Sequence, residues 1–399
     1  MSIRLKVAAD LMTSCVSSEV RPFVALEHLE SGTGRLVADA EVPERTAPDT
    51  GAASVEPGEV LFGKLRPYLA KTWLADRPVF ASTELLCLRP RAQVDGRWLA
   101  YLVASGPVVE WAVATSDGTK MPRTSWEKLA EYRIEIPPLT RQRAIADYLD
   151  RETARIDALI EKKRQMIELV EMRFWTALVD AILQLDAPLT PIRRVLTFLT
   201  DGPFGSAFTS QDYSEGGAAV VRLGNLGFAE YKPFEQAFIP QSLYWSFQRH
   251  RVLPGDLLIA GLGDPSNHPG RACVAPDLGP AIVKGKCFCA RVDVRRASTD
   301  YLALLLSSPY GAQAVGASGR GSTRTMINLE IIKETPLPLP AVSDQERIVQ
   351  AANRHRRRTR SLVVVLTDQI SRLGEHRQAL ITAAVTGELE VPEVPGVPA

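Results

Sequence analysis

An internal repeat of about 200 residues constrains the fold of this chain more than any other feature of its sequence. The segment 118–129 has a counterpart at 321–332, and each continues into a short strand-like run that ends at a proline break. Further upstream, the sequence Pro57-Gly-Glu, which is typical of a turn that leads into a strand, recurs as Pro254-Gly-Asp. We therefore expect two tandem domains that share a fold.

A long helical pattern follows each proline break. Gln142 and Gln345 each lie five residues after a proline and three before an isoleucine, where the pattern begins. Apolar residues then recur in alternating steps of four and three, which is the seam of a coiled coil. Each helix is expected to run for about 40 residues, or roughly 60 Å. The predicted seams are Leu149, Thr153, Ile156, Ile160, Lys163, Ile167, Val170, Phe174, Ala177 and Ala181, and Ile348, Ala352, His355, Thr359, Leu362, Leu366, Gln369, Leu373, His376 and Leu380.

The ends of both helices carry recognisable signals. Pro188 and Pro191 stop the first helix, and Gly387 is a plausible C-terminal cap of the second. Ser343 and Glu346 have the spacing of a capping box at the second start. We favour an antiparallel pair, because helices that end two tandem repeats can pack through repeated faces; the alternative is two helices that pack only on their own domains. The seam residues expected at the helix pair or at a partner are Leu149, Ile156, Ile160, Ile167, Leu362, Leu366, Leu373 and Leu380.

These patterns predict an α+β protein with two mixed α/β domains, each followed by a long helix, related by a pseudo-two-fold. Short strands are expected near 60–62, 84–88, 220–222 and 281–283, and short helices near 97–104 and 301–308. The predicted boundaries are a first domain at 1–140, a central helix at 141–184, a second domain at 185–341, a C-terminal helix at 342–387 and a disordered tail at 388–399.

Charge and cysteine usage limit the class of protein. Lys and Arg number 47 and Asp and Glu 46, so any nucleic-acid footprint must be local. The five scattered cysteines argue against a disulfide framework, and Cys287 and Cys289 lack the second pair that a structural zinc needs. No run of 18 apolar residues and no secretory signal occur, which favours a reduced, cytoplasmic protein without a bound metal.

The motifs of the relevant enzyme classes are missing. The only Pro-Pro pair, Pro137 and Pro138, is not preceded by the Asn or Asp that an amino-methyltransferase loop requires. No P-loop sequence is present, and the five histidines show no catalytic ordering. We therefore expect no catalytic residues and no cofactor.

Local clusters of cations are the candidates for DNA contact. Lys64 and Arg66 lie two apart, so in a strand they would face the same side. Arginine can pair with guanine edges, and lysine can neutralise phosphate; the alternative is a solvated strand edge. The repeated glycine-rich loop carries cations in both halves. The predicted DNA-binding residues are Lys64, Arg66, Lys71, Lys120, Arg123, Lys284, Lys286, Arg320 and Arg324.

Two further features stand apart from these clusters. The run 354–360 holds five arginines, and on a helix they would point in all directions. A solvated or partner-facing surface is favoured there over contact with the DNA backbone. Tyr244 and Trp245 are expected in the core.

Taken in order, these segments resemble the DNA-specificity subunit of type I restriction–modification systems over essentially the whole chain. The resemblance implies two target-recognition domains that each read one half of a split double-stranded site. It implies that the helices form the spacer and the dock for two methyltransferase subunits, and that a restriction subunit joins through them. Arg141 departs from the family, which usually has an acidic residue there, as at Asp344. The segments that carry the resemblance are 25–34, 58–69, 81–84, 201–206, 221–225 and 379–387.

Two other classes stay open. A methyltransferase or restriction enzyme with its own active site would modify or cut DNA alone, given S-adenosylmethionine, ATP and magnesium. A coiled-coil scaffold without a DNA role would show no salt-sensitive binding to duplex DNA.

Overall fold

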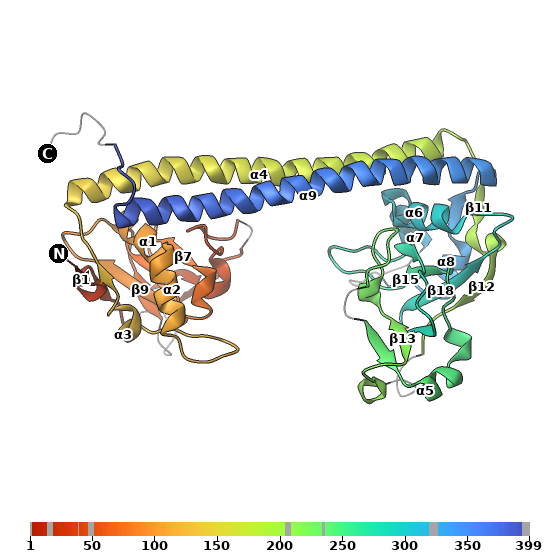
Figure 1. Ribbon diagram of the computed structural model, residues 1–399, viewed down its shortest axis with the longest axis horizontal. Coiled ribbons are helices and arrows are strands. Elements are labelled where there is room, and N and C mark those ends of the chain that lie inside the picture. Colours follow the sequence, from red (N-terminus) through yellow and green to blue (C-terminus); the bar gives the residue numbers. More distant parts are fainter. Residues whose placement is uncertain are drawn as a thin grey trace. The chain divides into compact units, whose positions relative to one another are not determined.

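The computed structural model describes residues 2–13, 19–38, 40–46, 52–203, 209–233, 236–318 and 326–392. Two compact units make up the chain, and two long helices contribute to both (Figure 1). Unit 1 consists of Met1–Arg164 and Leu366–Ala399, and unit 2 of Gln165–Val365.

In the described part of unit 1 there are two four-stranded sheets and three short α-helices. The first sheet is antiparallel and has the strand order β2-β9-β6-β7, with Ala9–Leu11 (β2), Leu85–Pro90 (β9), Val60–Gly63 (β6) and Thr72–Leu74 (β7). The second has the order β4-β3-β8-β5, with Glu44–Thr46 (β4), Val20–Val24 (β3), Val79–Ala81 (β8) and Ala53–Val55 (β5). Ile3–Arg4 (β1) pairs with Arg133–Ile134 (β10). The helices are Gly96–Ala104 (α1), Gly106–Ala114 (α2) and Trp126–Leu129 (α3).

Unit 2 repeats this plan with new side chains. Its antiparallel sheet has the order β12-β18-β15-β16, with Leu196–Thr200 (β12), Cys287–Val292 (β18), Leu257–Ala260 (β15) and Ala272–Val274 (β16). A three-stranded sheet has the order β14-β13-β17, with Ala237–Ile239 (β14), Ala218–Val221 (β13) and Ala281–Val283 (β17). Leu189–Pro191 (β11) pairs with Pro336–Pro338 (β19). The helices are Gln241–Ser246 (α5), Thr299–Ser307 (α6), Pro309–Ser318 (α7) and Leu329–Glu334 (α8). The strand order of the main sheet is the same in both units, as the sequence repeat predicts.

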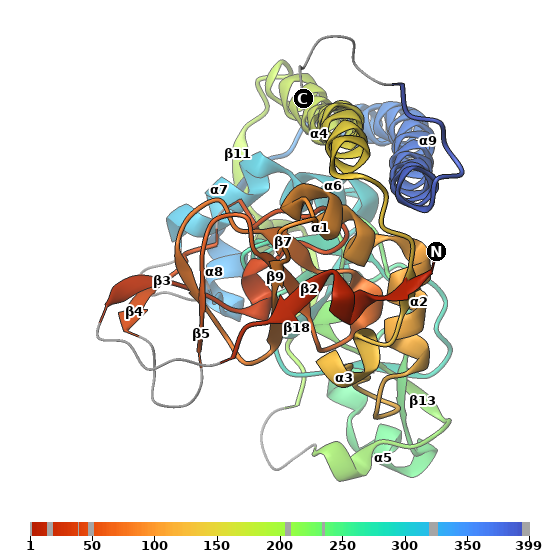
Figure 2. The same ribbon diagram turned by 90° about the vertical axis from the view of Figure 1, so that its left-hand side faces the viewer.

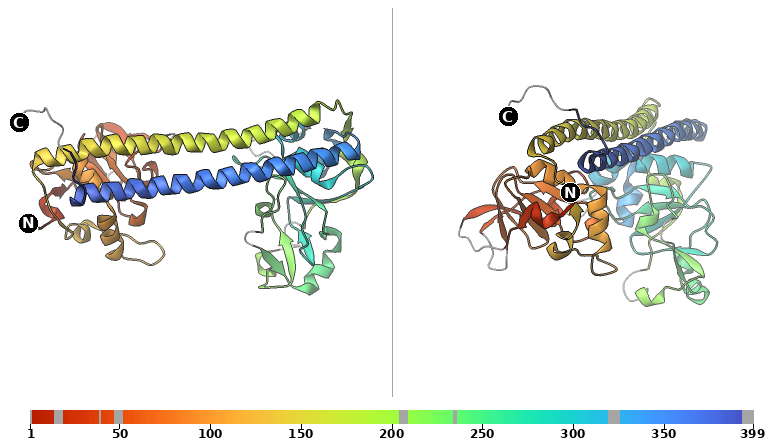
Figure 3. Two further views of the ribbon diagram at one scale, coloured as in Figure 1. Left: turned by 45° about the horizontal axis from the view of Figure 1, so that its top comes forward. Right: turned by 60° about the vertical axis from the view of Figure 1, so that its left-hand side comes forward.

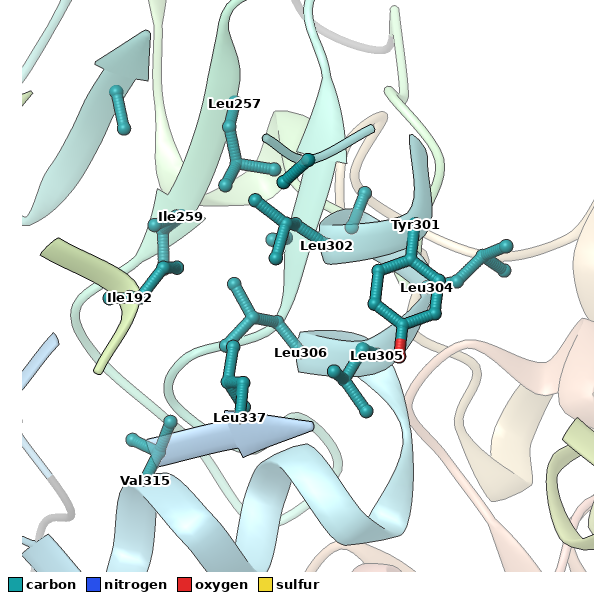
Figure 4. Close-up of a cluster of buried hydrophobic side chains, with 14 of the residues drawn as sticks. Ile192, Leu257, Ile259, Tyr301, Leu302, Leu304, Leu305, Leu306, Val315 and Leu337 are labelled. Atoms are coloured by element: carbon teal, nitrogen blue, oxygen red, sulfur yellow. The ribbon is translucent and has the colours of Figure 1, made fainter. Parts of the chain in front are cut away.

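Each main sheet packs on a helix that separates it from the long helices. In unit 1, α1 lies between the sheet and the long helices (Figure 2). In unit 2 the core gathers β15, α6, α7 and β19 around the buried Tyr301 (Figure 4). The Tyr301 hydroxyl donates to the carbonyl of Pro338 at 2.8 Å, so the one polar group of this ring is satisfied inside the core.

The acidic residue of each Pro-Gly-acid turn has a structural role. Glu59 and Asp256 are each only 4% exposed. Glu59 accepts a hydrogen bond from the backbone of Glu56 at 3.1 Å, and Asp256 one from the backbone of Leu253 at 2.9 Å. Each also pairs with an arginine of the adjacent central strand, Arg89 in β9 and Arg291 in β18. In both units, burial of the carboxylate is thus compensated by one backbone N–H group and one arginine.

The glutamines at the two helix starts are fully buried and make equivalent contacts. The Gln142 amide donates to the carbonyl of Pro137 at 2.8 Å and accepts from the backbone of Asp95 at 2.8 Å. The Gln345 amide donates to the carbonyl of Pro340 at 2.8 Å and accepts from the backbone of Ser298 at 2.8 Å. Asp95 and Ser298 are the N-caps of α1 and α6. Each glutamine therefore joins the start of a long helix to the start of the helix beneath it.

We expect Gln345→Glu to destabilise unit 2 by about 2 kcal/mol, because a carboxylate cannot donate to the Pro340 carbonyl. Urea unfolding followed by circular dichroism measures the change. Gln184→Glu, an exposed position in the same unit, is the matched control and should have almost no effect. Equal stabilities of the two variants would contradict the role of Gln345.

The two long helices run in opposite directions and lie side by side within each unit (Figure 3). In unit 1, Lys163 donates to the side chain of Gln369 at 2.7 Å. In unit 2, Phe174 packs edge-on against His355 with ring centroids 5.4 Å apart. Each helix has 45 residues, about 68 Å at 1.5 Å per residue. The helices are Leu139–Leu183 (α4) and Val342–Thr386 (α9).

The predicted seam holds in part. Leu149, Ile156 and Leu366 are buried, with exposures of 0%, 6% and 4%. Leu362 is 40% exposed, so its placement in a seam within the chain is wrong. The half-buried members of the predicted set are Ile160, Ile167, Leu373 and Leu380.

Near its end, α4 turns a different face inward from the predicted one. Ala177 and Ala181 are exposed, whereas Leu178 and Ile182 are buried in the core of unit 2. A straight helix drifts from a strict heptad repeat, and here the helix packs on its own unit as well as on the other helix. For the same reason His376 in α9 is exposed and its neighbour Arg377 takes the buried place.

The two ends of α9 also differ from expectation. Val342 already lies in the helix, so Ser343 is not its cap. Gly387 does adopt the left-handed conformation expected of a C-terminal cap, with φ 83°. After it, Val391 is only 3% exposed and packs in the core of unit 1, so the prediction of disorder is wrong for this part of the tail. The remainder of that predicted tail, 393–399, lies outside the described residues.

Candidate nucleic-acid interface

Three loops of unit 1 meet where β6 ends. The backbone N–H of Lys64 donates to the carbonyl of Glu84 at 2.9 Å, and the N–H of Arg66 donates to the carbonyl of Pro122 at 2.7 Å. The N–H of Thr124 donates back to the Lys64 carbonyl at 3.0 Å. The loop between α2 and α3 lies on the side of the unit away from α4 and α9 (Figures 1 and 2). Two cation clusters that are far apart in the sequence therefore share one surface.

The cations on this surface divide into anchored and free side chains. Lys64 donates to the carbonyl of Thr83 at 2.7 Å, and Arg123 pairs with Glu84 at 2.6 Å. Arg66 and Lys120 are exposed. The sequence predicted that Lys64 and Arg66 face the same side of a strand, and this prediction is wrong. The strand ends at residue 63, and Arg66 adopts a left-handed conformation with φ 51°.

Lys71, also predicted to contact DNA, is held by a contact within the protein. Its ammonium donates to the carbonyl of Leu26 at 2.9 Å, and desolvation by burial lowers its pKa. It anchors the loop before it to the segment Leu26–His28 (η2), and a contact of Lys71 with DNA stays a prediction.

Unit 2 brings together the equivalent loops. The N–H of Gly261 donates to the carbonyl of Lys286 at 2.7 Å, and Leu262 pairs with Met326. Lys284 donates to the hydroxyl of Tyr213 at 2.9 Å and lies over that ring at 4.7 Å. The predicted residues Arg320 and Arg324 lie outside the described residues.

A glycine permits one of these close approaches. The N–H of Gly202 donates to the carbonyl of Gly285 at 3.0 Å, beside Lys284. A Cβ at position 202 would lie 2.4 Å from the backbone of Lys284 and Gly285, well inside van der Waals contact. Gly202 belongs to the segment 201–206 that carried the sequence resemblance, so its role is to let the basic loop approach.

Arg271 is a buried cation that the sequence analysis missed. It directly precedes β16, as Lys71 precedes β7, and this matched position was the available signal. The residue is only 4% exposed, and desolvation by burial lowers its pKa. Its guanidinium joins the loop after β13 to the loop after β15. It donates to the carbonyls of Leu226 at 2.9 Å, His268 at 3.1 Å, Leu262 at 3.2 Å and Leu223 at 3.4 Å.

A second missed arginine ties a loop of unit 1 to the long helices. Arg377 of α9 donates to the carbonyls of Gly32 at 2.8 Å and Thr33 at 2.7 Å, and pairs with Asp157 of α4 at 3.0 Å. The side chains of Arg377 and Asp157 are 8% and 11% exposed. Arg35 reaches the same carboxylate at 2.9 Å from an exposed position.

Trp245 in α5 is 63% exposed, contrary to its predicted place in the core. Its neighbour Tyr244 packs against the buried residues of the three-stranded sheet, and the two rings lie 5.3 Å apart. The pair therefore has one ring in the unit and one at its surface.

The middle of the helix pair presents apolar side chains at its surface in unit 2. On α4 they recur in steps of three, and on α9 they fall within one turn. The exposed residues are Met166, Leu169, Met172, Leu362, Val364 and Val365. Several large apolar side chains exposed on two neighbouring helices are typical of a surface that binds another protein.

The described residues include no group of three or more His, Cys, Asp or Glu side chains that could hold a metal ion. Cys87, Cys273, Cys287 and Cys289 are free and buried, as expected, and Cys15 lies outside the described part of the chain. Among the helices of the described ranges, none is both long and apolar enough to cross a membrane.

Residues 44–169 match a known family, the type I restriction modification DNA specificity domain. The chain is 25% identical over 144 residues to the EcoDI type I restriction enzyme specificity subunit of Escherichia coli, a match that spans 35% of this chain and 31% of that protein. It is 20% identical to the Escherichia coli EcoBI specificity subunit, over 92% of this chain and 80% of that protein.

The fold has a solved counterpart. A chain from a structural study of complex assembly in a type I restriction–modification system matches with a TM-score of 0.70 and 19% identity, covering 98% of both chains. The match extends over both units and both long helices. By the domain match, the two curated relatives and this fold, the chain is similar to type I restriction–modification specificity subunits.

Proposed function

We propose that this chain is the subunit that reads a bipartite double-stranded DNA target, with one half-site for each unit. The observation that carries the proposal is the repeated loop cluster. In both units the loops after the equivalent strands β6 and β15 meet a second loop that precedes β9 or β18. Each cluster carries cations, which suits contacts with phosphates and base edges.

The two half-sites should differ in sequence. Unit 1 follows its strand with Lys64 and Arg66, whereas unit 2 has Gly261 and Gly263 at the matching places. Unit 2 instead carries Lys284 and Lys286 on the second loop, where unit 1 has Glu84. Cations and acids placed differently on one scaffold favour different base pairs. The same scaffold can thus read an asymmetric target.

The partners proposed for the helix pair are methyltransferase subunits, with restriction subunits joining through them. The exposed apolar residues of α4 and α9 in unit 2 support a protein partner at this surface. The seam residues that are half-buried within the chain, such as Ile167, could be covered further by such a partner.

We propose that the chain itself is not catalytic and works in the cytoplasm. The sequence lacks an Asn-Pro-Pro or Asp-Pro-Pro loop and a P-loop, and free buried cysteines are typical of a reducing compartment. Methyl transfer by the purified chain alone would contradict the first of these statements.

The test of the proposed function is a map of methylated bases. The chain is co-expressed with a type I methyltransferase subunit in a host without type I methylation, and genomic DNA is sequenced for modified adenines. The expected result is one asymmetric, split motif that depends on this chain. An unchanged methylation map, with both proteins shown to co-purify, would overturn the proposal.

Removing the exposed cations Arg66 and Lys120 from the loop surface of unit 1 should affect one half-site only. Arg66→Ala with Lys120→Ala is expected to weaken binding by about 1–3 kcal/mol and to relax discrimination at that half-site. Competition binding with duplexes altered in either half-site measures this. Arg4→Ala with Lys6→Ala removes the same charge from unit 1, where both residues pair with Glu131, and serves as the control. Equal loss of discrimination at both half-sites would contradict the assignment.

A further inference from the structure

The arginine-rich run of α9 lines a groove in unit 2. The groove has a volume of about 590 Å³ and lies between α9 and the loop after β13. Four arginines and one carboxylate line it, which leaves an excess of three positive charges. The lining residues are Ala229, Glu230, Gln350, Asn353, Arg354, Arg356, Arg357 and Arg360.

Two of the four arginines build the wall of the groove. Arg356 donates to the carbonyls of Ala229 at 2.8 Å and Phe228 at 3.0 Å. Its guanidinium also lies over the rings of Phe174 and Trp175, at 5.4 Å and 5.8 Å from their centroids. Arg360 pairs with Glu230, so most of its charge is balanced locally. The wall is therefore held in place before anything binds.

The other two arginines are available to a ligand. Arg354 and Arg357 are exposed on the same side of α9, three residues apart. Arg358, next in the chain, is also exposed but does not line the groove. The helix thus presents one pair of guanidinium groups into the groove and a third cation away from it.

We propose that this groove binds the sugar–phosphate backbone of duplex DNA through Arg354 and Arg357, without reading the sequence. This inference rests on the proposed function and adds a contact outside the loop clusters. Guanidinium groups pair with phosphate oxygens in a planar, bidentate geometry. Backbone contacts of this kind fix the register of a protein on DNA and leave the choice of bases to other residues.

The chemistry of the lining favours DNA over a protein. Ala229 is the one apolar residue among the eight that line the groove, whereas a protein interface usually has an apolar centre. Such a centre is present elsewhere, at the exposed apolar side chains of the helix pair. The groove also lies near a loop that is proposed to read bases. Its residues Ala229 and Glu230 belong to the loop after β13, and Arg271 joins that loop to the base-reading loop after β15.

Salt dependence of binding tests the proposal directly. The purified full chain is titrated with mixed-sequence duplex DNA at several salt concentrations. The slope of log K against log salt is negative, and each lost phosphate contact reduces its magnitude by about 0.9, so Arg354→Ala with Arg357→Ala should reduce the magnitude by about 1.8. Binding should weaken by a similar factor for cognate and altered duplexes.

A single-charge comparison provides the control. Arg357→Ala should reduce the magnitude of the slope by about 0.9. Arg358→Ala, the same substitution one residue away, should leave the slope nearly unchanged. Equal slopes for Arg357→Ala, Arg358→Ala and the unaltered chain would overturn the groove assignment while leaving the proposed function intact. Loss of methyltransferase co-purification with an unchanged slope would show instead that the groove binds protein. Absence of DNA binding by the unaltered chain and its methyltransferase complex would count against the proposed function itself.

Discussion

Arg271→Met is expected to lower the free energy of unfolding of unit 2 by at least about 3 kcal/mol. The guanidinium supplies donors to four backbone carbonyls and is only 4% exposed, so an apolar side chain of similar length leaves several acceptors without a partner. Urea unfolding gives the size of the effect, and hydrogen exchange measured by mass spectrometry locates it. Exchange should rise at 223–226 and 262–268.

The matched control for this change is Arg295→Ala. Arg295 pairs with Asp293 at the surface of the same unit, and its side chain is 85% exposed. An ion pair with such an exposed arginine contributes little to stability. If Arg271→Met were no more destabilising than Arg295→Ala, the carbonyls would have found other donors and the role of Arg271 in fixing the loops would be wrong.

Arg377→Ala should destabilise unit 1 by about 3–5 kcal/mol. The change removes two donors from the carbonyls of Gly32 and Thr33, and it takes the buried partner from Asp157. Faster hydrogen exchange is expected at 30–38 and in α4 near Asp157. The loop that follows η2 would then be released from the long helices.

Arg35→Ala is a sharp control for Arg377, because both side chains contact Asp157. Arg35 is 55% exposed, so its removal should cost no more than about 1 kcal/mol. A double-mutant cycle between Arg377 and Asp157 should give a larger coupling than one between Arg35 and Asp157. Equal couplings would mean that burial of Arg377 adds nothing to the interaction.

Arg377 has a counterpart in the other unit that the repeat does not predict. Arg356 also reaches from α9 to two loop carbonyls, those of Phe228 and Ala229. Both loops follow a short helical turn after the equivalent strands β3 and β13, namely η2 and Leu223–Asn225 (η7). In each unit an arginine of α9 therefore fixes the loop that follows this turn. Both arginines belong to α9, so the two units have the same kind of contact although the arginines do not occupy positions that match in the repeat.

The sequence by itself determined the features that depend on local patterns. The repeat predicted two domains of one fold, and the main sheets do have the same strand order. The spacing of apolar residues and the proline breaks predicted the two long helices closely, since α4 and α9 span Leu139–Leu183 and Val342–Thr386. The short helices expected near 97–104 and 301–308 are α1 and α6. Apolar spacing, glycine and proline act over a few residues, so these features can be read without the tertiary structure.

The roles of the cations were decided only by the tertiary structure. Lys71 and Arg271 precede matching strands, yet the sequence suggested DNA contact for one and nothing for the other. Both end on backbone carbonyls of segments about 45 residues earlier in the chain, Leu26 for Lys71 and Leu226 for Arg271. A long flexible side chain can reach many acceptors, and which carbonyl lies within reach depends on how distant segments fold together. The local sequence pattern therefore fixes the position of a cation relative to a strand. Only the folded loops decide whether the side chain bonds to the protein or stays available to DNA.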